Sequence, residues 1–268
     1  MIRKLFRFVF LMIFSISLFI GCEENIKDSE LDSLRLEGGA EITTREPSPV
    51  SNNILQAKYS EFVFLSGQKD DFRVALTFDD GPDPRYTTRI LDILKKHDAR
   101  ATFFLVGARA KAYPDIVKRM RDEGHSVGNH TFWHPNLAKE GTQRMHWELT
   151  QTSKVLHDIL GYRTSLFRAP YGSLNEELVE LAGSMGYKVI GWSVDSNDWM
   201  QLSSEQIKKN VLSNVNPGSI ILMHDGGHWT MDLLGTVDAL EEIIIRLKED
   251  GIEFVTVDEL LDLPVEKE

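Results

Sequence analysis

The chain has a single cysteine, Cys22, in 268 residues. One thiol cannot form a disulfide within the chain, so the fold has to be held together by its hydrophobic core. Hydrophobic residues make up 42% of the sequence and charged residues 26%, which is an ordinary globular composition. A chain of this length can bury one large core. The sequence therefore excludes a small disulfide-rich module and predicts one substantial folded domain.

Positive charge is also scarce. Lysine and arginine number 30 against 41 aspartates and glutamates, which gives a formal net charge of -11 at pH 7. A surface with this excess of acid repels phosphate backbones, because like charges raise the energy of the complex. Nucleic acid is therefore excluded as an expected partner.

The sequence lacks an apolar run of the roughly 20 residues that a membrane-spanning helix needs. Its apolar N-terminal run, residues 8–20, has 13 residues and follows the basic start MIRKLFR. This pattern is typical of a secretory signal peptide, and FIGC at 19–22 resembles a lipobox. We expect residues 1–21 to be a lipoprotein-type signal peptide and Cys22 to carry lipid. The protein would then be exported and anchored to the outer face of a bacterial cytoplasmic membrane; the alternative is an uncleaved N-terminal membrane anchor.

Residues 22–70 have a different composition from the rest of the chain. They are rich in polar residues, with GG and EPSPVSNN segments, and large apolar side chains are few before EFVFL. Such segments cannot bury enough apolar surface to fold alone. We expect a flexible polar tether, which would reach about 35 Å if roughly 40 of its residues behave as a coil. Residues 71–268 would form the functional domain.

From residue 72 onward, short apolar runs alternate with longer amphipathic segments. Runs that are apolar throughout and separated by helices predict parallel strands buried on both faces. Such α/β units can close into a barrel or form an open doubly wound sheet, and periodicity alone does not choose between them. The expected strands are residues 73–78, 101–107, 125–129, 165–169, 188–193, 219–224 and 253–257.

Ionisable side chains gather where these strands end, at the edge where both architectures bind ligands. Two histidines four residues apart, His130 and His134, can share one cation with an aspartate as third ligand. Nitrogen and oxygen ligands of this kind suit zinc or another divalent transition metal. The other ionisable or polar residues at strand ends are Asp79, Asp80, Arg168, Tyr171, Asp195, Asp198, His224 and Asp225.

Five segments occur in the order of the five motifs of the polysaccharide deacetylases, carbohydrate esterase family 4. They are TFDDGPDP (77–84), HTFWHPNL (130–137), RAPYG (168–172), DSNDW (195–199) and ILMHD (221–225). The chain resembles this family from residue 72 to about residue 260. The resemblance implies a distorted (β/α)7 barrel with mainly parallel strands. It also implies metal-dependent removal of acetyl groups from a polymer that contains N-acetylglucosamine, such as peptidoglycan or chitin.

The resemblance also implies a role for each matching residue. The metal would be zinc, or cobalt or another transition ion. A cation beside the base favours its ionised form, and an imidazolium is a suitable acid near neutral pH. Asp80, His130 and His134 would bind the metal. Asp79 would be the base, paired with Arg168, and His224 would be the acid, paired with Asp195. Tyr171 would offer its backbone N–H to the oxyanion and also contact substrate, Leu222 would line the acetyl pocket, and Trp199 would form one wall of the cleft beside a mainly structural Asp198.

Three alternatives differ from this interpretation. An O-acetyl glycan esterase would use the same site on an ester. A non-catalytic carbohydrate-binding lipoprotein of the same fold would be expected to lack a ligand or the base, and none is missing here. Another zinc hydrolase would carry a different ligand pattern such as HExxH, which the sequence does not contain.

Overall fold

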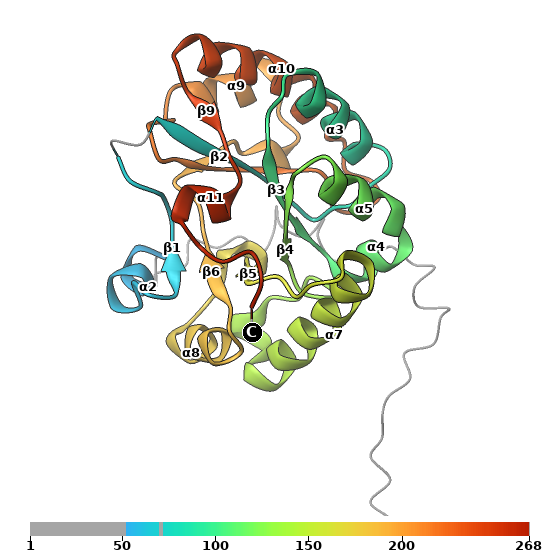
Figure 1. The fold of residues 1–268 in the computed structure, drawn as a ribbon, viewed down its shortest axis with the longest axis vertical. Helices are drawn as coiled ribbons and strands as arrows, with labels where there is room; N and C mark the ends of the chain where they lie inside the picture. The colour runs from blue at the N-terminus through green and yellow to red at the C-terminus, as the bar shows by residue number, and fades with distance from the viewer. Residues whose placement is uncertain (1–51, 70–71, 268) are drawn as a thin grey trace, which may run out of the picture. The chain divides into compact units, whose positions relative to one another are not determined.

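A computed structural model of the chain describes residues 52–69 and 72–267 (Figure 1). The expected signal peptide, Cys22 and the first part of the expected tether lie outside the described residues. Within the described part, no helix combines the length and the apolar character needed to cross a membrane.

The described residues form a nine-stranded sheet in which every strand pairs with its neighbour in parallel. The strand order is β1-β6-β5-β4-β3-β2-β8-β7, and β9 pairs with β2. The central strand β2 has six consecutive buried residues, as expected for a strand covered on both faces. The strands are β1 Val63–Phe64, β2 Arg73–Asp79, β3 Ala101–Leu105, β4 Ser126–Asn129, β5 Leu166–Phe167, β6 Lys188–Ile190, β7 Val194–Asp195, β8 Ile220–His224 and β9 Glu253–Phe254.

Helices surround the strands (Figure 1). Their ends follow ordinary capping chemistry: Pro114 occupies the first turn of α5, and the Asn175 side chain accepts a hydrogen bond from Leu178 N at the start of α8. The helices are α2 Asn52–Lys58, α3 Thr87–Lys96, α4 Gly107–Ala112, α5 Pro114–Asp122, α6 Leu137–Glu140, α7 Thr142–Leu160, α8 Glu176–Ser184, α9 Ser204–Leu212, α10 Leu234–Glu249 and α11 Val257–Leu261, with 3-10 turns η3 Pro170–Gly172 and η4 Asp198–Met200.

The strand path curls so that its two ends meet. The expected strand 188–193 is in fact interrupted: β6 pairs with β5, whereas β7 pairs with β8. Ser193 N, between them, donates to Ile220 O at 3.0 Å, and Gly67 N donates to Gly218 O at 2.7 Å beside a Ser66–Ser219 bridge. These bonds link β1 and β6 to β7 and β8. The expected distorted (β/α) barrel with parallel strands is confirmed.

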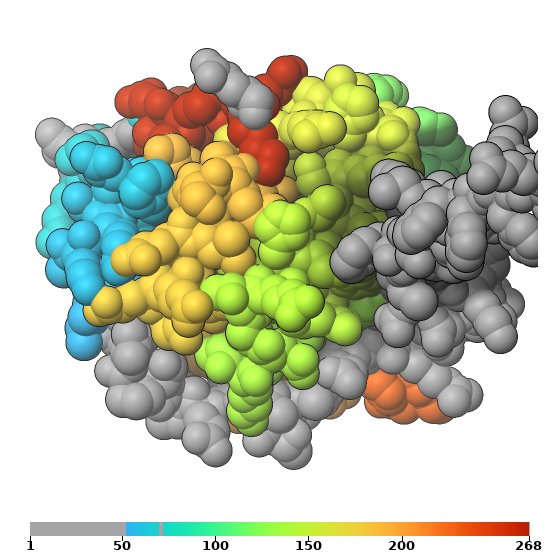
Figure 2. All heavy atoms as spheres, turned by 90° about the horizontal axis from the view of Figure 1, so that it is seen from below, coloured from blue at the N-terminus to red at the C-terminus, as the bar shows by residue number. Residues whose placement is uncertain are grey.

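The expected tether boundary at residue 70 is wrong. Residues 52–69 contain α2 and β1, and β1 joins the sheet beside β6. Leu55, Val63 and Leu65 are buried in one core cluster with residues of α7 and α8. Tyr59 Oη donates to Glu180 at 2.8 Å, and α2 (blue) lies beside the segment that contains α8 (yellow-orange) in Figure 2. The folded domain therefore begins at or before Asn52, because these apolar side chains complete its core.

Candidate active site and metal centre

The functional side chains are carried by the ends of four parallel strands. Asp79 ends β2, Asn129 ends β4, and His224 ends β8, while Arg168 follows β5 directly. Because parallel strands end at one edge of a sheet, residues up to 145 positions apart in sequence become neighbours there. The predicted ionisable side chains do gather at the carboxyl ends of the strands.

Asp80, His130 and His134 form the candidate metal site. Asp80 Oδ1 lies 3.3 Å from His130 Nε2 and 3.0 Å from His134 Nε2, and all three side chains are buried. One ligand atom from each lies within 4.8 Å of the others. Two of the three residues have a positive φ, 74° at Asp80 and 61° at His134, a strained conformation for residues other than glycine. The backbone thus holds an unfavourable shape that aims three donors at one point.

The surroundings of these residues fit a bound divalent cation. His130 Nδ1 lies 2.8 Å from the backbone carbonyl of Arg168, which only accepts, so Nδ1 carries the proton and Nε2 presents its lone pair to the site. Burial alone would raise the pKa of Asp80. Attraction to His134 and His130 outweighs burial and holds this pKa well below its ordinary value. Asp80 is therefore ionised, as a metal ligand must be.

Glu148 of α7 fixes the loop that carries the two histidines, and the sequence analysis missed it. Its Oε2 accepts hydrogen bonds from the backbone N–H groups of Phe132 (2.6 Å) and Trp133 (2.8 Å). Its Oε1 accepts from Arg144 Nε at 2.8 Å, and the side chain is completely buried. Burial raises the pKa of Glu148 even though these donors favour the charged form. A glutamate on the buried face of a helix was the signal that could have revealed this role.

Asp79 and Arg168 form the predicted ion pair. Arg168 Nη1 donates to Asp79 Oδ1 at 2.8 Å and to Thr77 Oγ1 at 2.7 Å. The same guanidinium donates from Nε to Ile190 O (3.1 Å) and from Nη2 to Gly191 O (2.9 Å), and both side chains are buried. Asp79 Oδ2 lies 3.8 Å from His130 Nε2, so the predicted base stands directly beside the metal ligands.

His224 Nδ1 pairs with the carboxylate of Asp198, to which the sequence analysis assigned a mainly structural role; the predicted pairing of His224 with Asp195 stays a prediction. Asp198 Oδ1 lies 2.7 Å from His224 Nδ1, and Oδ2 accepts from His224 N and Thr236 Oγ1, each at 2.8 Å. Burial opposes ionisation of Asp198, but the attraction and hydrogen bonds of His224, with help from Thr236, lower its pKa. Asp195 Oδ1 accepts a bond from Asn197 N at 2.8 Å.

The remaining predicted site residues lie around this centre. Tyr171 has a φ of 61° in η3, and its ring packs edge-on against His134 with centroids 4.8 Å apart. Leu222 of β8 is buried opposite Thr77 of β2 and Asp195 of β7. Trp199 in η4 is partly buried against the largest core cluster. Their roles toward substrate stay predictions.

Asp225, which received no role from the sequence, braces the loop after β2. Its Oδ2 accepts from Thr87 Oγ1 at 2.6 Å, and a side chain on Gly81 would collide with this carboxylate. Burial, with the nearby charges of Asp80 and Asp83, raises the pKa of Asp225 to about 7. The carboxylate thus keeps Gly81, and with it Asp80, close to the end of β8.

Comparison with known proteins identifies the family. The model of the family described as polysaccharide deacetylase matches residues 66–190. A Bacillus cereus peptidoglycan-N-acetylglucosamine deacetylase is 44% identical over 205 residues, which cover 76% of this chain and 73% of the relative. The chain belongs to the polysaccharide deacetylase family, as its five motifs predicted.

Two solved structures extend the comparison. The Bc1960 peptidoglycan N-acetylglucosamine deacetylase is 41% identical with a TM-score of 0.75, and the match covers 79% of this chain and 98% of that one. BA3943 from Bacillus anthracis, described as a family 4 pseudoenzyme, is 32% identical with a TM-score of 0.69, covering 75% of this chain and 69% of that one. Since the family includes a pseudoenzyme, activity has to be argued from the residues of this site.

Proposed function

We propose that the protein is a metal-dependent N-deacetylase that removes acetyl groups from N-acetylglucosamine residues of peptidoglycan. One observation carries the proposal: beside the Asp80, His130 and His134 triad, the site holds a carboxylate paired with a cation and an imidazole paired with a carboxylate. Amide hydrolysis requires both a base and an acid. A positively charged partner suits the carboxylate to the role of base, and a negatively charged partner suits the imidazole to the role of acid. The similarity to deacetylases named for peptidoglycan supports this substrate.

The side chains of the site supply most of the reaction. Asp79, oriented by its hydrogen bond from Arg168, accepts the proton of the water that attacks the acetyl carbon. The backbone N–H of Tyr171 is the proposed donor to the oxyanion, an interaction worth about 2.7 to 4 kcal/mol in other enzymes. The imidazolium of His224, stabilised by Asp198, donates a proton to the departing nitrogen. The chain thus provides base, oxyanion donor and acid around one bond.

The triad is proposed to hold zinc, with cobalt or another transition ion as the alternative. Two imidazole nitrogens and one carboxylate oxygen suit a borderline cation, and three protein ligands leave a position open for substrate or water. When bound, such a cation polarises a carbonyl and makes water more acidic.

Release of acetate by the purified full-length chain tests the function. Peptidoglycan, chitin oligomers and acetyl-xylan would be incubated with the metal-loaded protein, with a chelator and with the Asp79→Asn variant, whose amide cannot accept the proton. We expect release from peptidoglycan that both treatments abolish. Release that survives chelation would contradict the proposal. Release from acetyl-xylan alone would favour the esterase alternative, and binding without release the non-catalytic one.

We also propose that the protein is a lipoprotein on the outer face of the cytoplasmic membrane. The basic start, the short apolar run and the position of Cys22 support this location. Peptidoglycan lies outside that membrane, so the location agrees with the proposed substrate. A Cys22→Ser change should move the protein from the membrane fraction to the soluble fraction. If the variant stays with the membrane, the uncleaved anchor is favoured.

A further inference from the structure

A groove of about 300 Å³ opens beside the metal site. Its lining residues are Asp83, Pro84, Arg85, Arg109, Tyr113 and Trp229. One wall begins three residues after Asp80 and the other ends five residues after His224. A chain spans at most about 11 Å over three residues and about 18 Å over five. The groove is therefore close enough to the site to hold a sugar next to the one that reacts.

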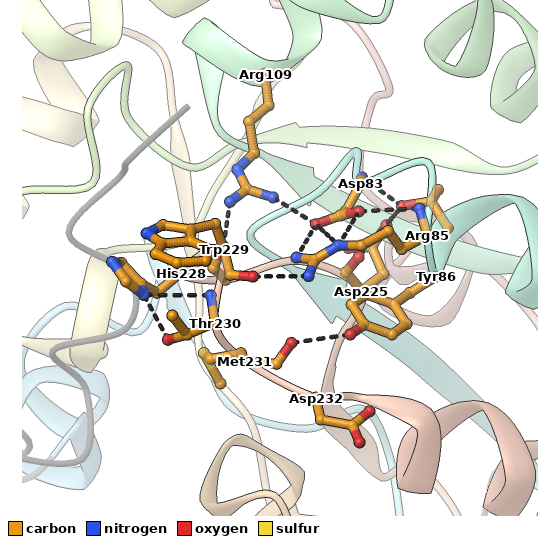
Figure 3. Close-up of polar contacts among 12 residues, drawn as sticks. Asp83, Arg85, Tyr86, Arg109, Asp225, His228, Trp229, Thr230, Met231 and Asp232 are labelled. Atoms are coloured by element: carbon orange, nitrogen blue, oxygen red, sulfur yellow. Dashed lines mark hydrogen bonds and ion pairs between the residues drawn. The ribbon is translucent and has the colours of Figure 1, made fainter. Parts of the chain in front are cut away.

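Among the residues that line the groove, two arginines face one carboxylate. Asp83 lies between two arginines: Arg85 Nη2 donates to its Oδ2 at 2.7 Å and Arg109 Nη1 at 3.3 Å (Figure 3). Burial opposes ionisation of Asp83, but these arginines lower its pKa, so one negative charge faces two positive ones. The surplus cation is unusual in a chain of net charge -11. The two lining arginines favour an anion in the groove, and the nearby charge of Asp232 offsets part of this attraction at Arg85.

Arg85 is the cation that a ligand can reach. Arg109 is buried and also donates to Gly227 O, whereas the Arg85 side chain is 43% exposed. Arg85 donates from Nε and Nη2 to Asp83 and from Nη1 to Trp229 O at 2.8 Å. These bonds use three of the five N–H donors of a guanidinium. The head group is thus held in place by fixed partners and keeps donors for a carboxylate, which arginine binds in a forked geometry.

Trp229 supplies a flat apolar surface on the same side. It is 58% exposed, so its ring is accessible to a ligand in the groove. The bond from Arg85 to its carbonyl fixes the backbone of Trp229 (Figure 3), and Trp229 lines the same groove as Arg85 and Arg109. An indole face and a cation side by side match a pyranose ring that carries an acidic substituent.

We propose that this groove binds a carboxylate-bearing amino sugar adjacent to the N-acetylglucosamine that is deacetylated, with Trp229 stacked on its ring and Arg85 paired with the carboxylate. The inference rests on the proposed function, and it explains why the enzyme would prefer peptidoglycan to chitin. Alternate sugars of peptidoglycan carry a lactyl carboxyl group, either free or joined to a peptide with its own carboxylates. Chitin carries no carboxylate, so the groove selects peptidoglycan.

The test compares substrates that differ in their carboxylates. Acetate release would be measured on chitin oligomers, on peptidoglycan strands stripped of peptide and on strands that keep it. The quantity is the ratio of kcat/KM on each type of strand to kcat/KM on chitin oligomers. Replacing Arg85→Met should lower this ratio about tenfold or more, because a charge-assisted bond is lost. Arg85→Lys keeps the charge and should lower it less.

A matched control separates this result from general damage. Arg89 on α3 is similarly exposed and pairs only loosely with Asp238, at 3.7 Å, so Arg89→Met should leave the ratio unchanged. If Arg85→Met lowers the ratio on stripped strands, the carboxylate that pairs with Arg85 is that of the lactyl group. If the ratio falls on peptide-bearing strands alone, that carboxylate belongs to the peptide. An unchanged ratio in Arg85→Met overturns the inference, even if both rates fall. If the unmodified protein releases acetate from none of the substrates, the proposed function itself has failed.

Discussion

Replacing Asp198→Asn tests whether this residue supports the acid His224. The two oxygens of Asp198 accept three bonds, and two of these, from His224 N and Thr236 Oγ1, go to Oδ2. An asparagine has one acceptor oxygen, and His224 N and Thr236 Oγ1 will both donate to it. Its NH2 group must then face His224 Nδ1, where the imidazolium also presents an N–H. The substitution therefore destabilises the charged acid while keeping the shape of the side chain.

The expected loss is large. A hydrogen bond to a charged group contributes about 1.5 to 3 kcal/mol, and general acid catalysis contributes about 10² to 10⁴ in rate. We expect kcat/KM to fall by about 10² or more. Since the imidazolium form is less stable in the variant, the alkaline limb of the pH–rate profile should move to lower pH by about one to two units.

The assay is acetate release measured across pH, with Asp195→Asn as the comparison. This variant keeps the Asp198–His224 pair, and its amide oxygen can still accept from Asn197 N, so it should lose less activity than Asp198→Asn. Circular dichroism would check that both variants fold. If Asp198→Asn keeps its rate and its pH profile while Asp195→Asn loses activity, the assignment of Asp198 is refuted.

Three further effects should be measurable. Glu148→Ala should weaken metal binding about 10- to 100-fold in a chelator competition, because the loop that carries the histidines loses its hydrogen bonds to Glu148. Glu140→Ala on α6 should leave the metal affinity unchanged. Equal affinities of the two variants would contradict this role of Glu148. Arg168→Lys should lower the free energy of unfolding by about 3 kcal/mol or more, because an ammonium group cannot reach all four hydrogen-bond partners of the guanidinium. Urea unfolding would measure this, and a change of less than about 1 kcal/mol would refute it. Burial lowers the pKa of His125 from 6.5 to about 4, so the unfolded chain binds the proton at a higher pH than the folded chain does. The free energy of unfolding should therefore fall as the pH drops from 6.5 to 4. His125→Asn should remove up to about 3 kcal/mol of this pH dependence, and an unchanged dependence would contradict the argument.

Much of the fold could be predicted from the sequence because buried parallel strands leave a strong pattern. Each of the seven expected segments contains a strand, although that of 188–193 stops at Ile190, and the triad and the Asp79–Arg168 pair lie where strand ends should bring them. β1 was missed because it has only two residues and is a strand only through its bonds to β6. Its segment is too short and too polar in its flanks to show a period of its own.

The choice between Asp195 and Asp198 could not be made from spacing. Asp195 ends the short strand β7 and Asp198 follows three residues later, and the chain between them turns at Asn197, whose φ is 55°. This left-handed turn directs Asp198 toward His224, and its formation depends on tertiary contacts such as the bond from Thr236 in α10. Sequence reasoning sees two equivalent carboxylates where the folded chain distinguishes them.

The guanidinium of Arg168 sits at the break between β6 and β7, where it bonds to the carbonyls of Ile190 and Gly191 and to Asp79 at once. The stability of the barrel and the presence of the base are thus coupled. A descendant that lost Asp79 would keep a buried cation without its carboxylate, a defect that costs about 3 to 5 kcal/mol in other proteins. A change such as Asp79→Ala should therefore lower the stability of the barrel together with the activity.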